Sequence, residues 1–408
     1  MKVKEQNVPV LRFPGFEGKW EKTTIGQVAN YENGKAHEKN IDESGEFIVV
    51  NSKFISTCGK VKKYTKQAYC PAHKEDILMV LSDVPNGRAI AKCFYVDSDN
   101  LYTVNQRICK ITSCNAVSRL LFYVLNRNVY FLRFDDGVKQ TNLRKDDVLS
   151  CKMLLPKDSE EQQKIAAFLT AVDSKIEQLN KKKALLEQYK KGMMQKLFSQ
   201  EIRFKDEQGN EFPDWELKKL GELAIGGFSN GVFNDPQKVG TGYRLINVKD
   251  MYTGNIISVA TLSRLNISEK EFAKNKVKHG DTFFTRSSLV KEGIAYSNVF
   301  LGKENDVTYD GHLIRMRLDL AAVNPIYLAY QLKTNQIRRQ LVRRGKTTTM
   351  TTIGQQDVAT VKIDLAPYEE QRKIADFLSS IDKKINLIST ELNHARSFKK
   401  SLLQQMFV

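Results

Sequence analysis

The chain has 408 residues and a formal net charge of +17, from 64 lysines and arginines against 47 aspartates and glutamates. At roughly 100–200 residues per domain this length predicts two to four domains, and the basic excess favours a polyanionic partner, either nucleic acid or an anionic membrane surface. The sequence has no apolar run of about 18 residues and begins without an apolar signal core, which weakens the membrane interpretation. We therefore expect a cytoplasmic protein that binds nucleic acid.

Residues 1–158 are expected to form a first globular domain of the α+β or mixed α/β class. β-Branched and aromatic runs such as EFIVVNSKFI alternate with turns and predict strands, whereas SRLLFYVLNR predicts a helix. The six cysteines all lie in the first half without a CxxC pair, and Cys70 and His73 stand alone. Because a structural zinc site needs a second such pair, we predict no metal site.

Residues 159–199 are predicted to form one long helix that begins shortly after Pro156. Its apolar residues recur at steps of three and four, as in a coiled coil, and Ser159 with Gln162 predicts a capping box at its start. At 1.5 Å per residue, about 40 helical residues span about 60 Å. The apolar positions are Ile165, Leu169, Val172, Ile176, Leu179, Leu186 and Met193.

Residues 200–366 are expected to form a second domain, and residues 367–408 a second long helix. The segment EEQQKIAAFLTAVDSKI of the first helix returns as EEQRKIADFLSSIDKKI in the second, with 11 of 17 positions identical. Upstream of the helices, WEKTTIGQVA from Trp20 is similar to WELKKLGELA from Trp215. We interpret the chain as a tandem duplication in which each variable domain is followed by a matched helix.

The two helices are expected to bury their apolar seams against each other as an antiparallel coiled coil. The duplicated domains would then be related by a pseudo-two-fold axis, and helix length would set the spacing between two DNA half-sites. Two paired helices alone would leave some large apolar side chains unburied. Either a partner protein or the chain's own domains could cover them. These candidate subunit-docking residues are Phe168, Phe198, Phe377 and Phe407.

We find no catalytic motif that predicts an enzyme. RRGKTTT contains Gly-Lys-Thr, but a phosphate loop needs a glycine five residues before Gly345, where Gln340 stands. One alternative is a stand-alone metal-dependent nuclease using Asp214, Glu216 and Lys218, although the matching segment of the first half lacks the Pro-Asp pair. Another is a structural coiled-coil DNA-binding protein whose charge is incidental. The missing catalytic groups favour a protein that supplies recognition to catalysts in other chains.

With two variable domains and two matched helices, the chain resembles the specificity subunit of type I restriction-modification enzymes over its whole length. The resemblance is carried by EEQQKIAAFLTAVDSKIEQL and EEQRKIADFLSSIDKKINLI, and by LRFPGFEGKW and GDTFFTRSS. It implies that each domain recognises one half of a split double-stranded DNA sequence, and that the helices fix the gap and dock two methyltransferase subunits that methylate adenine. Restriction subunits would join them. S-adenosylmethionine, ATP and Mg²⁺ would belong to those partners, with no cofactor in this chain.

Candidate DNA contacts follow from the usual chemistry of recognition: arginine binds guanine, asparagine or glutamine binds adenine, and lysine contacts phosphates. Arg286 in FTRSS aligns with Leu81 of the first domain, so a DNA-contacting role for Arg286 does not transfer to the first half. The first-domain candidates are Lys60, Lys62, Lys63, Asn86, Arg88 and Lys139. The second-domain candidates are Arg286, Ser287, Ser288, Lys291, Arg343, Arg344 and Lys346.

Overall fold

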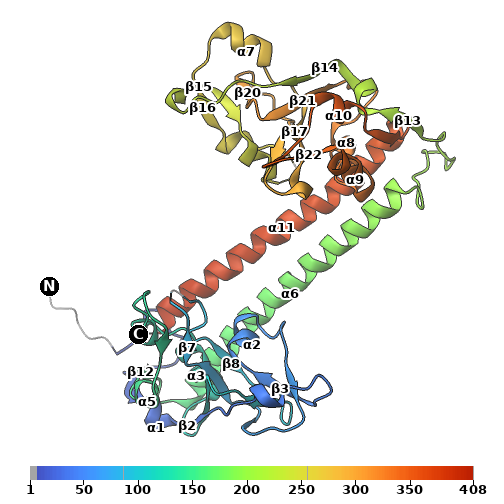
Figure 1. Cartoon of the computed structure of the whole chain (residues 1–408). Coiled ribbons are helices and arrows are strands. Elements are labelled where there is room, and N and C mark those ends of the chain that lie inside the picture. The colour runs from blue at the N-terminus through green and yellow to red at the C-terminus, as the bar shows by residue number, and fades with distance from the viewer. Residues whose placement is uncertain (1–6, 86, 255, 408) are drawn as a thin grey trace. The chain divides into compact units, whose positions relative to one another are not determined.

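The computed structural model divides into two compact units, each holding one α+β domain and a stretch of two long helices, α6 (Ser159–Phe198) and α11 (Tyr368–Met406) (Figure 1). Unit 1 comprises Met1–Lys181 and Thr390–Val408, and unit 2 comprises Lys182–Ser389. The structure describes every residue except 1–6, 86, 255 and 408. The predicted α+β class is confirmed, and the two units repeat one order of elements.

Unit 1 is built on two four-stranded sheets and two short strand pairs. Its elements are β1 (Glu21–Thr24), α1 (Ile25–Val28), β2 (Ala29–Asn33), η1 (Glu38–Asn40), β3 (Phe47–Val50), α2 (Ser52–Ser56), β4 (Tyr64–Thr65), β5 (Pro71–Ala72), β6 (Ile77–Val80), β7 (Ser82–Asp83), β8 (Cys93–Tyr95), β9 (Tyr102–Val104), β10 (Ile108–Ser113), α3 (Ser118–Leu125), α4 (Val129–Leu132), β11 (Thr141–Asn142), α5 (Lys145–Leu149) and β12 (Lys152–Leu155). The central sheet has the order β2-β10-β6-β8, and the second has the order β4-β3-β9-β5, with β3 parallel to β9. The pairs are β1 with β12 and β7 with β11.

Unit 2 repeats this plan with longer connections. Its elements are β13 (Glu216–Lys219), η2 (Leu220–Leu223), β14 (Ala224–Asn230), η3 (Pro236–Lys238), β15 (Val239–Ile246), η4 (Val248–Tyr252), η5 (Val259–Thr261), β16 (Ser263–Leu265), α7 (Glu269–Asn275), β17 (Thr282–Thr285), β18 (Ser287–Ser288), η6 (Lys291–Gly293), β19 (Ser297–Val299), β20 (Val307–Tyr309), β21 (Leu313–Leu318), α8 (Pro325–Gln331), α9 (Asn335–Arg344), β22 (Lys346–Thr347), β23 (Thr351–Thr352), α10 (Gln355–Ala359) and β24 (Lys362–Leu365). Its central sheet has the order β14-β21-β17-β19, and β15 is parallel to β20 in the second sheet.

The core of unit 1 has two layers separated by the central sheet. Successive side chains of a strand point to opposite faces. Ile77 and Met79 of β6 therefore join one apolar cluster, which includes residues of α3 and the long helices, while Leu78 and Val80 join another against the second sheet. All four residues of β6 are buried, as the continuous apolar run ILMV requires. The sheet is thus a rigid base for the loops that leave its ends.

The start of α6 differs from the predicted capping box. The Asp158 carboxylate accepts a hydrogen bond from the Glu160 backbone N–H at 2.7 Å, so Asp158 caps the first turn rather than Ser159. The Gln162 side chain is buried and accepts from the Val117 N–H at 2.8 Å while donating to the Pro156 carbonyl at 2.8 Å. The capping-box prediction was wrong because Gln162 ties the helix to its domain instead.

The two long helices pack antiparallel, as predicted. In unit 1, Asp173 of α6 pairs with Lys399 of α11 at 2.5 Å. In unit 2, Lys190 of α6 pairs with Asp382 of α11 at 2.6 Å. Residue numbers therefore rise along α6 while those of its partner fall. Buried seam residues from both helices, such as Leu179, stabilise the pairing through the hydrophobic effect.

A tyrosine–aspartate–lysine network occurs once in each unit. In unit 1 the Tyr123 hydroxyl donates to Asp173 at 2.9 Å, and in unit 2 the Tyr330 hydroxyl donates to Asp382 at 2.6 Å. In each case the lysine of the opposite helix completes the network. Each network therefore connects one domain to both long helices, and it does so with the same residue types at repeat-equivalent positions.

Lys333 lies near the second of these networks, in the wall of a hollow of about 410 Å³ that Lys190 and Lys191 also line. Burial, with a smaller contribution from the charge of Lys190, lowers the pKa of Lys333 from 10.5 to about 8. Below pH 8 the ammonium is charged in both folded and unfolded chains, so the part of its burial cost that the charge of Asp382 does not offset opposes folding. Between pH 8 and 10.5 the unfolded chain binds more protons, so this cost disappears as pH rises.

We therefore expect Lys333→Met to raise the free energy of unfolding of unit 2 by about 2 kcal/mol at pH 7, and to give no gain near pH 10.5. Urea unfolding of the variant and the wild type at both pH values checks this. The difference between their free energies of unfolding, compared between the two pH values, reports the titration of Lys333 alone. The matched control is Lys191→Met, since Lys191 is an exposed lysine in the same wall. An equal gain at both pH values would contradict the assignment.

Candidate nucleic-acid interface

At one edge of each domain the central sheet continues into a small sheet, of two strands in unit 1 and three in unit 2, that carries polar and basic loops. In unit 1, β6 passes through Leu81 into β7, which pairs with β11. In unit 2, β17 passes through Arg286 into β18, which pairs with β23, and β23 pairs with β22. The backbone hydrogen bonds of these sheets hold the edge in a defined geometry.

The candidates of the second domain gather at this edge. Ser287 lies opposite Thr352 on one side, and Lys346 lies opposite Thr352 on the other. Arg286 comes directly before β18 and Lys291 follows it, and the side chains of both the arginine and the lysine are exposed. A segment of about 60 residues therefore folds so that its basic side chains meet within one three-stranded sheet and its loops.

Arg338 of α9 holds the loop that carries Lys291. Its guanidinium donates to the carbonyls of Glu292, Ile294 and Ala295 at 2.8, 2.7 and 2.6 Å. Burial lowers the pKa of Arg338, and three carbonyl acceptors satisfy the buried guanidinium. The sequence analysis missed Arg338, which positions the loop rather than presenting itself to a ligand.

Two further candidates on α9 have different environments. Arg343 is exposed at the end of the helix. Arg344 donates to the Thr360 hydroxyl at 3.2 Å, the Thr360 carbonyl at 3.3 Å and the Gln340 carbonyl at 3.0 Å. The guanidinium of Arg344 thus connects α9 to the end of α10, which leaves few of its donors for a ligand.

In the first domain, Arg88 and Lys139 lie on loops that lead from β7 and into β11. Asp83 organises the first loop, because its carboxylate accepts from the N–H groups of Val84, Ala89 and Ile90. Asp136 organises the second, since the Lys139 and Val138 N–H groups donate to it and lower its pKa. Asn86 lies outside the described residues.

Lys60, Lys62 and Lys63 lie elsewhere in the first domain. All three are exposed, in the connection between α2 and β4 that borders the second sheet. No described strand pairing joins this connection to the edge that carries Arg88 and Lys139. The first-domain candidates thus form two groups on different sheets.

A hollow of about 460 Å³ opens at the edge of the first domain, and the sequence analysis missed it. Gln140 donates across it to the Ser82 hydroxyl at 2.7 Å and to the Asn142 side-chain oxygen at 3.2 Å. Its lining residues are Leu81, Ser82, Gln106, Arg107, Gln140, Asn142 and Leu143. Amides and a guanidinium of this kind are the groups that hydrogen-bond to base edges.

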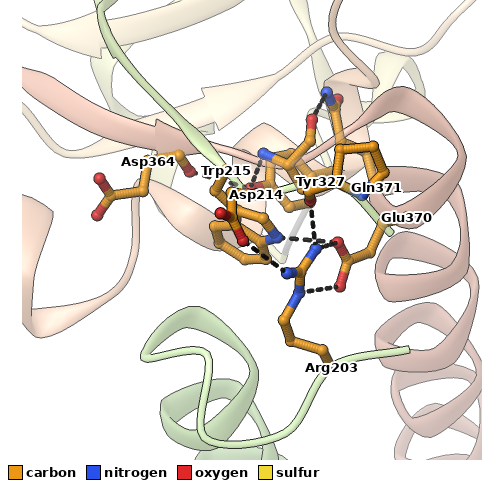
Figure 2. A network of polar contacts seen from close by, with 9 residues as sticks. Arg203, Asp214, Trp215, Tyr327, Asp364, Glu370 and Gln371 are labelled. Atoms are coloured by element: carbon orange, nitrogen blue, oxygen red, sulfur yellow. Dashed lines mark hydrogen bonds and ion pairs between the residues drawn. The ribbon is translucent and has the colours of Figure 1, made fainter. Parts of the chain in front are cut away.

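A buried carboxylate fixes each domain to its long helix. In unit 2, the Arg203 guanidinium donates to both Glu370 oxygens at 3.2 and 2.7 Å, and the Trp215 indole N–H donates to Glu370 at 2.9 Å (Figure 2). In unit 1, Arg12 and Trp20 hold Glu161 in the same way. We call these two sets of residues the carboxylate clamps. Each sits at the start of a long helix and sets how that helix meets its domain.

The four phenylalanines predicted for docking all contact the chain's own domains. Phe198 is buried and packs on Trp215 and Tyr327, with ring centroids 6.4 and 5.5 Å apart. Phe168 packs on Phe13 at 5.6 Å. Phe377 packs on Phe204 at 5.7 Å, and Phe407 lies against the core of unit 1. Phe168, Phe377 and Phe407 remain partly exposed, so docking of a partner subunit on these residues stays a prediction beside their contacts with the chain's own domains.

The residues of the nuclease alternative do not form a carboxylate site. The Asp214 carboxylate is fully exposed and lies 3.7 Å from the Arg203 guanidinium. Glu216 pairs with Lys218 at 2.8 Å on β13. Among the described residues, no group of three or more histidine, cysteine, aspartate and glutamate side chains could hold a metal ion. In the same part of the chain, no helix has the length and apolarity needed to cross a membrane.

Comparisons with known proteins agree on one family. The type I restriction modification DNA specificity domain matches residues 17–188 and again residues 213–395. The chain is 24% identical over 98% of its length to the type I restriction enzyme MjaVIII specificity subunit of Methanocaldococcus jannaschii, covering 95% of that protein. It is 26% identical over 52% of its length to the MjaX specificity subunit of that organism, and spans about half (49%) of that relative. Its fold is similar to that of the type I restriction-modification system S subunit from M. genitalium, with a TM-score of 0.62 and 15% identity over 98% of this chain and 99% of that one.

Proposed function

Since the chain belongs to the type I restriction-modification DNA specificity family, and so is a DNA-recognition component rather than a catalyst, we propose that its two domains each recognise one half of a split double-stranded DNA target. The observation that carries this proposal is that the family domain occurs twice, once in each repeat. Each copy has a corresponding edge, where the central sheet runs into a small sheet of two or three strands with basic loops. The proposed domains are 1–158 and 200–366, and the proposed spacer helices are 159–199 and 367–408.

The basic loops at these edges are the proposed DNA contacts. In the second domain, Arg286 with Ser287 and Ser288 would contact base edges, while Lys291, Arg343 and Lys346 would contact phosphates. In the first domain, the proposed contacts are Arg88 and Lys139, on the loops beside the β7–β11 pair. Lys60, Lys62 and Lys63 would contact phosphates farther along the duplex. The net charge of +17 supports a polyanionic ligand.

The partners of the chain would be two methyltransferase subunits and the restriction subunits of the same system, acting on DNA in the cytoplasm. Those subunits would carry out adenine methylation and restriction. They would also hold the S-adenosylmethionine, ATP and Mg²⁺ that these reactions require. We propose that methyltransferase subunits dock on the partly exposed Phe168, Phe377 and Phe407 beside the buried Phe198, and on the exposed apolar residues of the helices. In unit 2 these are Leu185, Tyr189 and Leu387, which are 56%, 50% and 70% exposed.

Sequencing of methylated DNA from cells that carry this chain with its methyltransferase subunits tests the proposal. We expect one bipartite motif with a methylated adenine, absent when the gene for this chain is deleted. Replacing residues 1–158 by the first domain of a different specificity subunit should change one half of the motif only. A motif that is continuous, or that survives the exchange unaltered, would count against the proposal.

A further inference from the structure

Building on the proposed function, we propose that Arg107 is the base-recognising arginine of the first domain, and that the hollow beside it accepts the edge of a purine base. Nothing in the sequence distinguishes Arg107 from the other arginines of the chain. Its significance comes from its position in the fold. The corresponding position of the second domain is the one that is hydrogen-bonded to Arg286.

The backbone hydrogen bonds identify the equivalent positions. The Leu81 N–H donates to the Arg107 carbonyl at 3.0 Å in unit 1, and the Arg286 N–H donates to the His312 carbonyl at 2.8 Å in unit 2. On the other side, Leu143 donates to the Leu81 carbonyl at 2.8 Å, as Ile353 does to the Arg286 carbonyl at 3.0 Å. Leu81 thus corresponds to Arg286, and Arg107 corresponds to His312.

Each domain therefore has one arginine in this hydrogen-bonded pair of positions. In the first domain the arginine is at the position whose carbonyl accepts the bond, and in the second it is at the position whose N–H donates it. The first domain has leucine and arginine where the second has arginine and histidine. The first domain has no arginine at position 81, but it has one across the strand at position 107. A guanidinium is retained at the edge, displaced by one neighbouring position, as expected for two recognition surfaces with the same general chemistry and different target sequences.

Arg107 is exposed, and within the described structure no hydrogen bond or ion pair engages its guanidinium. Its backbone, by contrast, is held firmly. The Asn105 side chain accepts from the His37 N–H at 3.2 Å, and the side chains of Asn105 and Gln106 both donate to Glu38 at 3.0 and 3.2 Å. The fixed backbone places the start of the Arg107 side chain at this edge, and among the described residues its guanidinium donors have no rival acceptor.

The hollow next to Arg107 has the amides that a purine would use. Gln140 and Asn142 line it from β11 and the residue before it, and Gln106 lines it from the turn. Arginine pairs bidentately with guanine, and glutamine or asparagine pairs with adenine, through the N7 edge in the major groove. Amide side chains both donate and accept, which matches the donors and acceptors of a purine edge, whereas a phosphate only accepts.

The test uses the whole chain assembled with its own methyltransferase subunits. Arg107→Ala should make one base position degenerate in one half of the methylated motif, and Arg286→Ala should do so in the other half. Arg133→Ala is the matched control, since Arg133 is an exposed arginine of the first domain outside the hollow. We expect this variant to leave both halves unaltered.

If Arg107→Ala abolishes methylation, no methylated motif can be determined. Binding of the purified complex to synthetic duplexes is then measured instead. The wild-type complex should lose about 10- to 100-fold in affinity when the recognised base pair is exchanged, and the variant should bind the original and that exchanged duplex equally. If the variant weakens binding to all duplexes by the same factor, Arg107 contacts phosphate and the proposal is wrong.

The outcomes separate this inference from the proposed function. A wild-type chain that yields no bipartite motif would contradict the proposed function itself. A bipartite motif that Arg107→Ala leaves unchanged, at unchanged methylation, would overturn only the assignment of Arg107. The assignment of Arg107 would also be overturned if Arg107→Ala and Arg286→Ala altered the same half of the methylated motif.

Discussion

Glu370→Ala is expected to lower the free energy of unfolding of unit 2 by about 3 kcal/mol, because it leaves a guanidinium without its carboxylate. Glu370 is 0% exposed, and it binds Arg203 through both oxygens and the Trp215 indole through one. Glu370 also raises the pKa of the Arg203 guanidinium, and without Glu370 the arginine still stays charged, because a guanidinium is protonated at any pH near neutrality. Since the Arg203 side chain is 20% exposed, water can reach it and limit the loss.

The two tryptophans of the chain make this measurement selective. Trp20 lies in unit 1 and Trp215 in unit 2, each in contact with its own clamp. In a Trp20→Phe background, urea unfolding followed by fluorescence reports unit 2. The neighbouring Glu369→Ala is the control and should change stability by about 0.5 kcal/mol or less, because its carboxylate is 61% exposed in a surface pair. A shift from Glu370→Ala no larger than this control would show that the clamp is not stabilising.

Gly34→Ala is expected to destabilise unit 1 by about 3 kcal/mol and to weaken recognition by the first domain. A Cβ at Gly34 would lie 2.1 Å from the Asn105 carbonyl oxygen and 2.8 Å from that of Val104. These are backbone atoms, so no side-chain rotation can relieve the overlap. The turn that carries Arg107 must move, and its guanidinium moves with it.

Fluorescence of Trp20 in a Trp215→Phe background measures the stability, and duplex binding by the assembled complex measures recognition. Gly231 is the equivalent residue of unit 2, where a Cβ would lie 1.9 Å from the Tyr309 carbonyl oxygen, so Gly231→Ala should affect the other half of the target. Gly192 is the opposite control. It lies in α6 with nothing within 4 Å of an added Cβ, so Gly192→Ala should stabilise the chain by about 1 kcal/mol. Equal stabilities for all three variants would refute the steric argument.

The repeat, the α+β class and the antiparallel helices could be predicted because they depend on local pattern. The identical segments EEQ and KI, and the regular apolar spacing, are visible in a single sequence and need no knowledge of distant contacts. The carboxylate clamps could have been found in the same way. Arg12 and Arg203 both precede a tryptophan in matched segments, and Glu161 and Glu370 stand at one position of the repeat.

The recognition edge could be predicted only in part, because it is assembled by strand pairing over long sequence distances. Arg107 lies 26 residues from Leu81 in the sequence, and only the backbone hydrogen bond brings them together. Charge alone pointed to Lys60 and Arg344 as readily as to Lys346. The fold distinguishes them, since Lys60 borders the other sheet and Arg344 is engaged with Thr360.

The division of the chain has a consequence for how the protein matures on the ribosome. Unit 2 is one continuous stretch, whereas unit 1 needs Thr390–Val408, from which Leu402 and Met406 enter its core. Closing so long a loop is entropically unfavourable and slow. The region synthesised first therefore cannot complete its core until Thr390–Val408 has been made, so the positions that Leu402 and Met406 cover stay open until then.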